Sequence, residues 1–193
     1  MMKRGLFPAA CGVAIAMLAL VPAAEGAVWG VPYNVPAPSG SIERVSDLST
    51  TSRIAIPDLI FTDASNVPVH LSRYKGSVVV VNFYSQNCGP CMKDLLYINR
   101  LQGNFPKEPL VVLAVDEDNV QPRTLLPFLR HQNLGFLRPF SDPSNISANA
   151  LGVKGLPSSI VVDKAGKLVA AVQGNVVWDS PAVQTEIGRL LRE

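Results

Sequence analysis

Residues 78–91 read VVVVNFYSQNCGPC, a run of β-branched and aromatic residues followed by two cysteines that flank glycine and proline. The run from Val78 to Tyr84 is long and apolar enough to be a central strand buried on both faces. The segment from about Pro90 to Gly103 carries apolar residues mostly at helical spacing. The pair Cys88 and Cys91 is therefore expected just after a buried strand and at the start of a helix.

A cysteine pair with this spacing has three interpretations: half of a zinc site, a structural disulfide or a redox pair. Zinc needs four ligands, and the other candidates, His70 and His131, do not have a ligand-like spacing. A disulfide between Cys88 and Cys91 would close a very short loop, so it would stabilise the fold little. The position at a helix start favours the redox pair, because the free N–H groups of the first turn favour the thiolate of Cys88.

The residues between the cysteines suit that role. Pro90 falls within the first helical turn, where its missing N–H costs nothing, and Gly89 allows a close approach of the chain. Cys91 lies one turn inward, near enough to attack a mixed disulfide on Cys88. We expect Cys88 to be the exposed nucleophile and Cys91 the buried resolving thiol of one redox-active disulfide. No cofactor and no metal is expected, since the two cysteines carry the electrons.

The rest of the domain alternates between strand and helix patterns, which predicts a mixed sheet with helices on both faces. The DASN turn at residues 63–66 suggests an N-terminal β-hairpin, and the acidic residues Asp116, Glu117 and Asp118 are expected in a solvated loop. The predicted elements are a hairpin at 59–71, strands at 110–115, 158–162 and 168–172, a helix from Pro122, and a last helix that follows Ser180.

The N-terminus indicates export. Two basic residues precede an apolar run at residues 6–21, and small residues suit a cut before Ala27, so residues 1–26 are expected to be a signal peptide. An uncleaved membrane anchor is the alternative. Residues 27–53, rich in proline and serine, are interpreted as a spacer, and residues 54–193 as the folded domain. Cys11 lies near the start of the apolar run and not after it, which does not fit a lipid-modified cysteine.

The composition excludes some partners. The chain has 193 residues with a formal net charge of +2, and its 17 basic residues form no run. Nucleic-acid binding is therefore not expected. Cleavage of the signal would leave two cysteines, fewer than a disulfide-stapled scaffold of this size needs.

Two segments, VVVVNFYSQNCGPC and GVKGLPSSIVVDKAGKLV, resemble the thioredoxin superfamily, in particular its exported TlpA/ResA-like branch, which includes the CcmG/DsbE proteins. The resemblance covers nearly all of residues 54–193 and implies a thioredoxin fold. It also implies that Pro157 follows a cis peptide bond and faces the cysteines. The backbone of Leu156 would then pair with an extended substrate peptide.

Three further positions refine the resemblance. At the position of Asn82, cytoplasmic thioredoxins carry a buried acid, whereas an asparagine is usual in the TlpA/ResA-like branch. Asp94 stands where the branch carries a glutamate that would tune Cys91 or relay its proton; a first-turn acid favoured by the helix dipole is the alternative. Asn87 replaces the usual tryptophan before the first cysteine, which reduces the apolar docking surface for substrates. Trp178 and Tyr84 are interpreted as packing residues.

The resemblance implies a periplasmic thiol–disulfide oxidoreductase that reduces protein disulfides, in cytochrome c maturation or in the upkeep of copper-protein thiols. Its expected partners are an oxidised protein and a membrane thiol–disulfide reductase that donates electrons. A dithiol oxidase or isomerase, a peroxidase, and a thioredoxin-like chaperone or binding module are the alternatives. The motif is common to reductants, oxidants and isomerases.

Overall fold

The computed structural model describes residues 53–193. The predicted signal peptide and, apart from Arg53, the predicted spacer lie outside these residues. The strands are β1 (Ile54–Ala55), β2 (Ile60–Asp63), β3 (Pro68–His70), β4 (Val78–Tyr84), β5 (Leu110–Asp116), β6 (Arg138–Ser141), β7 (Ser158–Val162) and β8 (Lys167–Gln173). The α-helices are α1 (Gly89–Asn104), α2 (Leu125–His131), α3 (Ile146–Ala150) and α4 (Pro181–Arg192), and short 3-10 turns are η2 (Leu71–Tyr74), η3 (Pro122–Thr124) and η4 (Pro143–Asn145).

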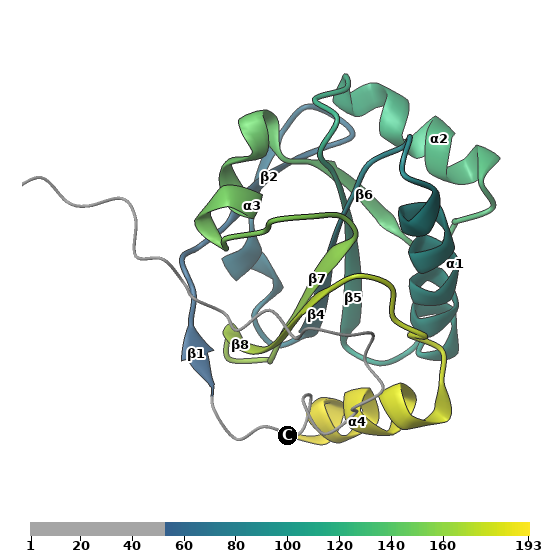
Figure 1. Cartoon of the computed structure of the whole chain (residues 1–193). Helices are drawn as coiled ribbons and strands as arrows, with labels where there is room; N and C mark the ends of the chain where they lie inside the picture. The colour runs from purple at the N-terminus through teal and green to yellow at the C-terminus, as the bar shows by residue number, and fades with distance from the viewer. Residues whose placement is uncertain (1–52) are drawn as a thin grey trace, which may run out of the picture. The chain divides into compact units, whose positions relative to one another are not determined.

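The strands form one mixed sheet in the order β1-β8-β7-β4-β5-β6-β2-β3 (Figure 1). The pairs β4–β5 and β5–β6 are parallel, and the other neighbours are antiparallel. Strand β4 is buried along its whole length, as expected for an apolar strand with neighbours on both sides and helices on both faces. Its C-terminal end leads into the cysteine motif, so a fully buried central strand holds the motif.

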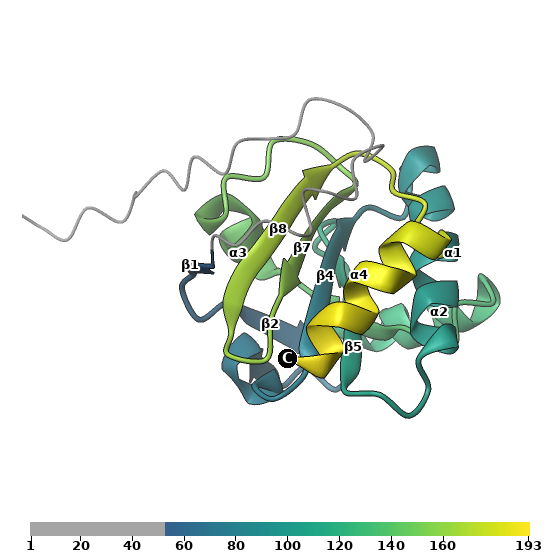
Figure 2. The same cartoon turned by 90° about the horizontal axis from the view of Figure 1, so that it is seen from below.

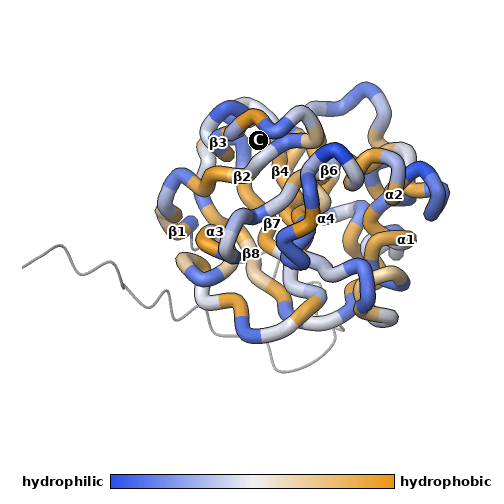
Figure 3. Tube along the Cα trace, turned by 90° about the horizontal axis from the view of Figure 1, so that it is seen from above, coloured by the Kyte–Doolittle hydropathy of each residue, from blue (hydrophilic) through white to orange (hydrophobic). Residues whose placement is uncertain are grey.

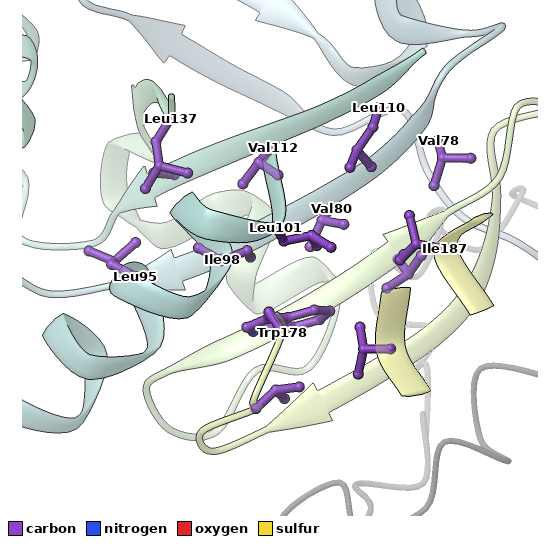
Figure 4. Close-up of a cluster of buried hydrophobic side chains, with 14 of the residues drawn as sticks. Val78, Val80, Leu95, Ile98, Leu101, Leu110, Val112, Leu137, Trp178 and Ile187 are labelled. Carbon is purple, nitrogen blue, oxygen red and sulfur yellow. The ribbon is translucent and has the colours of Figure 1, made fainter. Parts of the chain in front are cut away.

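Helices cover both faces of the sheet. Helices α1, α2 and α4 lie on one face and α3 on the other (Figures 1 and 2). On the first face, side chains from α1 and α4 pack against alternate residues of β4 and β5 and around Trp178 (Figure 4). Leu95, Ile98 and Ile187 are completely buried there. This packing fixes the first turns of α1 over the end of β4.

The opposite face has its own apolar cluster. Val79, Val81 and Phe83 of β4 pack there with Phe61 of the hairpin and with Leu151, just after α3. Figure 3 shows hydrophobic residues concentrated along the central strands and hydrophilic ones in the peripheral loops. Because residues of β4 alternate between the two clusters, each face of the sheet has a separate core.

The predicted mixed α/β thioredoxin fold and its N-terminal hairpin are confirmed. Strand β7 has the predicted bounds, and the last helix begins after Ser180, whose hydroxyl accepts a hydrogen bond from the N–H of Val183 at 3.4 Å. Strands β1 and β6 and helix α3 were not predicted. Strand β6 contains Pro139, which lies beyond the residues paired with β2, at an edge position that tolerates the missing N–H.

None of the helices within residues 53–193 is both long and apolar enough to cross a membrane.

Candidate active site

Cys88 and Cys91 form a disulfide at the start of α1, with an S–S distance of 2.03 Å. Cys88 is the N-cap residue of the helix, and its Sγ accepts a hydrogen bond from the N–H of Cys91 at 3.2 Å. Cys88 is half-buried, whereas Cys91 is completely buried. A substrate can therefore reach only the sulfur of Cys88, and the first-turn N–H that would stabilise its thiolate is already directed at it.

The Leu156–Pro157 peptide bond is cis. Pro157 is buried, Leu156 is half-buried, and the carbonyl of Pro157 accepts a hydrogen bond from the N–H of Gly174 at 2.8 Å. Gly174 has a φ of +98°, a conformation that favours glycine. The loop after β8 is thus joined to the segment that contains the cis peptide bond.

Asp94 is completely buried and accepts three hydrogen bonds, one from β4 and two from the loop at residues 174–178. Its Oδ1 binds the N–H of Val176 at 2.8 Å, and its Oδ2 binds Nδ2 of Asn82 at 2.7 Å and Nε1 of Trp178 at 3.3 Å. Burial raises the pKa of this carboxyl to about 6, while the bonds from Val176, Trp178, Asn82 and Asn175 act to lower it. Asp94 can therefore exchange a proton near neutral pH.

The location of Asp94 excludes one of its two interpretations. The first turn of α1 contains no acidic residue, since Asp94 lies in the second turn and faces the core. The interpretation as a first-turn acid favoured by the helix dipole is therefore wrong, because Asp94 lies beyond that turn and three donors outside the helix bind its carboxylate. Its role toward the thiol of Cys91 stays a prediction.

Asn82 connects Asp94 to strand β7. In the antiparallel register of β4 and β7 it lies opposite Ser159, and its Nδ2 also donates to Oγ of Ser159 at 2.8 Å. Oδ1 of Asn82 is buried and has no hydrogen-bond partner among residues 53–193. The position that carries a buried acid in cytoplasmic thioredoxins here carries a neutral donor to Asp94.

Sequence reasoning missed the contribution of the loop at residues 174–178. Asn175 donates a hydrogen bond from Nδ2 to the carbonyl of Pro90 at 2.6 Å, and Val176 and Trp178 both bind Asp94. Trp178 is fully buried in the core, as expected of a packing residue, but its indole N–H also binds the carboxylate. The tryptophan was the only signal in the sequence that pointed to this loop.

The residues beside Cys88 differ in what they offer a substrate. Asn87, Gly89 and Pro90 are exposed, and the N–H of Asn87 donates to Oγ of Ser85 at 3.3 Å. Tyr84 is buried, and its ring stacks on Phe128 with a centroid distance of 6.2 Å, which agrees with a packing role. The segment before Cys88 is polar at its surface and apolar beneath.

The prediction of a solvated acidic loop is wrong for Asp116, the last residue of β5, and for Glu117, whereas Asp118 is exposed as expected. Asp116 is completely buried and Glu117 is 8% exposed. The carboxylate of Asp116 accepts a hydrogen bond from Nε2 of Gln86 at 2.9 Å, and that of Asp118 accepts one from the N–H of Gln86 at 2.6 Å. Asp116 and Asp118 thus hold the segment that precedes Cys88.

Glu117 is a buried acid with a second acid, Asp142, nearby. Its Oε2 accepts a hydrogen bond from Nδ2 of Asn145 at 2.5 Å, and its Oε1 is buried without a partner within the described residues. Burial and the nearby Asp142 raise the pKa of Glu117 to about 8, with smaller contributions from Asp116 and Asp118. Asn145 has a φ of +55°, in the left-handed region that asparagine tolerates. Glu117 is thus a carboxyl that stays protonated at neutral pH.

The two histidines lie outside this site. His70 is exposed, and its Nδ1 lies 2.9 Å from Oδ2 of Asp58, while His131 is exposed at the end of α2. In the part of the chain that the structure describes, no three His, Cys, Asp or Glu side chains are arranged to hold a metal ion.

The model of the AhpC/TSA family matches residues 54–171, which is more than half of the chain. The chain belongs to this family. The matched residues include Cys88, Cys91, Asp94 and Pro157, whereas Asn175 and Trp178 follow them.

Sequence relatives place this AhpC/TSA family member in the TlpA/ResA-like branch. The thiol-disulfide oxidoreductase ResA of Geobacillus thermodenitrificans is 30% identical over 121 residues, which cover 62% of this chain and 68% of the relative. The protein of the same name from Bacillus thuringiensis is 28% identical over 118 residues, which cover 61% and 67%.

Solved structures agree with this placement. A structure from Chlorobium tepidum, described as a thiol:disulfide interchange protein DsbE, has 27% identity and a TM-score of 0.63, and the match covers 72% of this chain and 96% of that one. A thioredoxin of Neisseria meningitidis has 19% identity and a TM-score of 0.62, with 74% and 93% covered, and at that identity the likeness is of fold alone.

Proposed function

We propose that this protein is an exported reductant of protein disulfides in which Cys88 is the attacking thiol and Cys91 the resolving thiol. The chain is a thiol–disulfide oxidoreductase, the activity for which its ResA relatives are named. One observation carries the assignment of the two thiols: the Cys88–Cys91 disulfide has one half-buried and one fully buried sulfur at a helix N-terminus.

The reaction balances without a cofactor. The thiolate of Cys88 attacks one sulfur of a substrate disulfide, forms a mixed disulfide and releases the first substrate thiolate. The thiolate of Cys91 then attacks the sulfur of Cys88, which forms the Cys88–Cys91 disulfide and releases the second substrate thiolate. Two electrons pass to the substrate. Asp94 is suited to accept the proton of Cys91, since its pKa of about 6 lies near neutrality.

The proposed direction is reduction. The Cys-Gly-Pro-Cys sequence is that of reducing thioredoxins, which the resemblance extends to this chain. Because the bacterial periplasm is kept oxidising, electrons must arrive through the membrane, and a membrane thiol–disulfide reductase is the proposed donor. Residues 1–26 would direct export, as a cleaved signal or as an anchor, and residues 27–53 would act as a spacer.

An extended segment of an oxidised protein is the proposed substrate. It would pair with the backbone at Leu156, beside the cis peptide bond, and reach Cys88 past Asn87. Asn87 offers no apolar ring, but Val177 in the neighbouring loop is 53% exposed and supplies apolar surface. Apocytochrome c and copper-protein thiols are the substrates that the family resemblance suggests.

Trapping with Cys91→Ser tests the proposal, because this variant cannot resolve the mixed disulfide. We expect it to retain oxidised proteins of the same compartment through Cys88, while the matched Cys88→Ser variant retains none and does not reduce insulin. Mass spectrometry of the linked peptides reports the bond. Equal capture by both variants, or a cellular function that survives Cys88→Ser, would instead establish a binding or chaperone module.

A further inference from the structure

The peptide group between Pro90 and Cys91 is hydrogen-bonded on both sides. Its N–H donates to Sγ of Cys88 at 3.2 Å, and its carbonyl oxygen accepts from Nδ2 of Asn175 at 2.6 Å. The two bonds share one conjugated amide. Asn175, the peptide group and the sulfur of Cys88 therefore form a continuous chain of donors and acceptors.

Hydrogen bonds in such a chain strengthen one another. A donor to the carbonyl oxygen draws electron density toward that oxygen, which makes the N–H of the same amide a better donor. Condensed-phase estimates of this strengthening are roughly 10–30% per bond. The acceptor at the far end is neutral sulfur in the disulfide and a thiolate in the reduced protein, and charge-assisted bonds to anions are about twice as strong as neutral ones.

We propose that Asn175 is a positioning residue that stabilises the thiolate of Cys88 through the Pro90–Cys91 peptide group. This inference rests on the proposed function, in which Cys88 is the attacking thiol, and extends it to a residue outside the first turns of α1. The hydrogen bond of Asn175 is to the carbonyl of Pro90 and not to a cysteine, so the proposed effect reaches the sulfur of Cys88 through the amide.

The neighbours of Asn175 hold it in place. The N–H of Gly174 binds the carbonyl of Pro157, and the N–H of Val176 binds Oδ1 of Asp94. Each bond ties one side of Asn175 to a part of the site. Asn175 is half-buried and belongs to neither apolar cluster of the core. A change at Asn175 therefore acts first on its contact with the active-site turn.

Several ionisable groups face this turn. Cys91 and Asp94 lie on α1, and Asp116 and Asp118 approach from the end of β5, where they bind Gln86. Asn175 also contributes to lowering the pKa of Asp94. The test must therefore separate the path through the peptide group from a path through Asp94.

The first measurement is the pH dependence of iodoacetamide alkylation of Cys88 in the reduced protein. Asn175→Leu keeps the number and branching of the side-chain heavy atoms and removes the donor. The thiol pKa of Cys88 is expected to rise by roughly 0.3–0.7 units, which lowers its thiolate fraction at neutral pH roughly two- to fivefold. The matched control is Gln184→Leu. Gln184 lies on α4, and its side chain donates a hydrogen bond of the same 2.6 Å length to the carbonyl of Asp179. This control should leave the profile unchanged.

The second measurement identifies the path. In the oxidised protein, where the cysteines do not titrate, the amide proton of Cys91 should move upfield in the NMR spectrum of Asn175→Leu, because its peptide group is less polarised. An unchanged Cys91 amide or an unchanged Cys88 profile overturns the inference. Neither readout uses a substrate, so a failure of the proposed reductase function would appear in the trapping experiment and not here.

Discussion

Replacing Asp94 by alanine is expected to lower the free energy of unfolding by about 3–5 kcal/mol. The carboxylate is the acceptor for Asn82, Val176 and Trp178, which come from β4 and from the loop before α4. Each buried donor left without an acceptor costs about 1–3 kcal/mol. The side chain is completely buried, so its removal also leaves a cavity.

Urea denaturation of the oxidised protein measures this effect. The matched control is Asp63→Ala, which removes a carboxylate that also accepts two backbone N–H groups, those of Ser65 and Val67, but is only half-buried, at the end of β2. Water can replace that acceptor, so the control should lose no more than about 1 kcal/mol. Equal losses in the two variants would mean that Asp94 does not join the loop to α1.

Because the pKa of Glu117 is raised in the folded protein, we expect the free energy of unfolding to fall as the pH rises above neutrality. A carboxyl whose pKa in the folded protein is raised from 4.5 to about 8 binds its proton more tightly when folded than when unfolded. Its contribution is fully present below about pH 4.5 and is lost as the pH rises toward 8. Between pH 6.5 and 8.5 the free energy of unfolding should fall by roughly 2 kcal/mol from this group.

Above pH 6.5 the pH dependence comes mainly from Glu117, because Asp94, with a pKa of about 6, has largely ionised. Denaturation of the oxidised protein across this window is compared with that of Glu117→Gln, whose curve should be flatter because the amide does not ionise. Glu108→Gln, at an exposed glutamate, should keep the wild-type slope. A slope that is the same in all three proteins would show that Glu117 is not a protonated buried acid.

The sequence was sufficient to predict those elements whose pattern lies within one segment of the chain. The apolar runs of β4 and β7 and the apolar face of α4 are all patterns within one segment. Strand β6 and helix α3, with four and five residues, are too short to show a period. Their positions depend on pairing with β5 and β2 and on packing against the second face of the sheet.

The same distinction holds for the site. The cysteine pair is one short motif, so its place at a helix start could be predicted. The burial of Asp116 and Glu117 could not, because it depends on partners far along the chain, Gln86 and Asn145. Asn175 approaches Pro90 across 85 residues of sequence, and no local pattern marks such a contact.

The reduction potential of the Cys88–Cys91 couple tests the central claim, that this oxidoreductase is a reductant. The protein is equilibrated with defined ratios of reduced and oxidised dithiothreitol or glutathione, and the fraction of reduced Cys88 and Cys91 is counted after alkylation. We predict a potential near that of thioredoxin, about −270 mV. A value near that of DsbA, about −120 mV, would contradict the account and make the protein a dithiol oxidase.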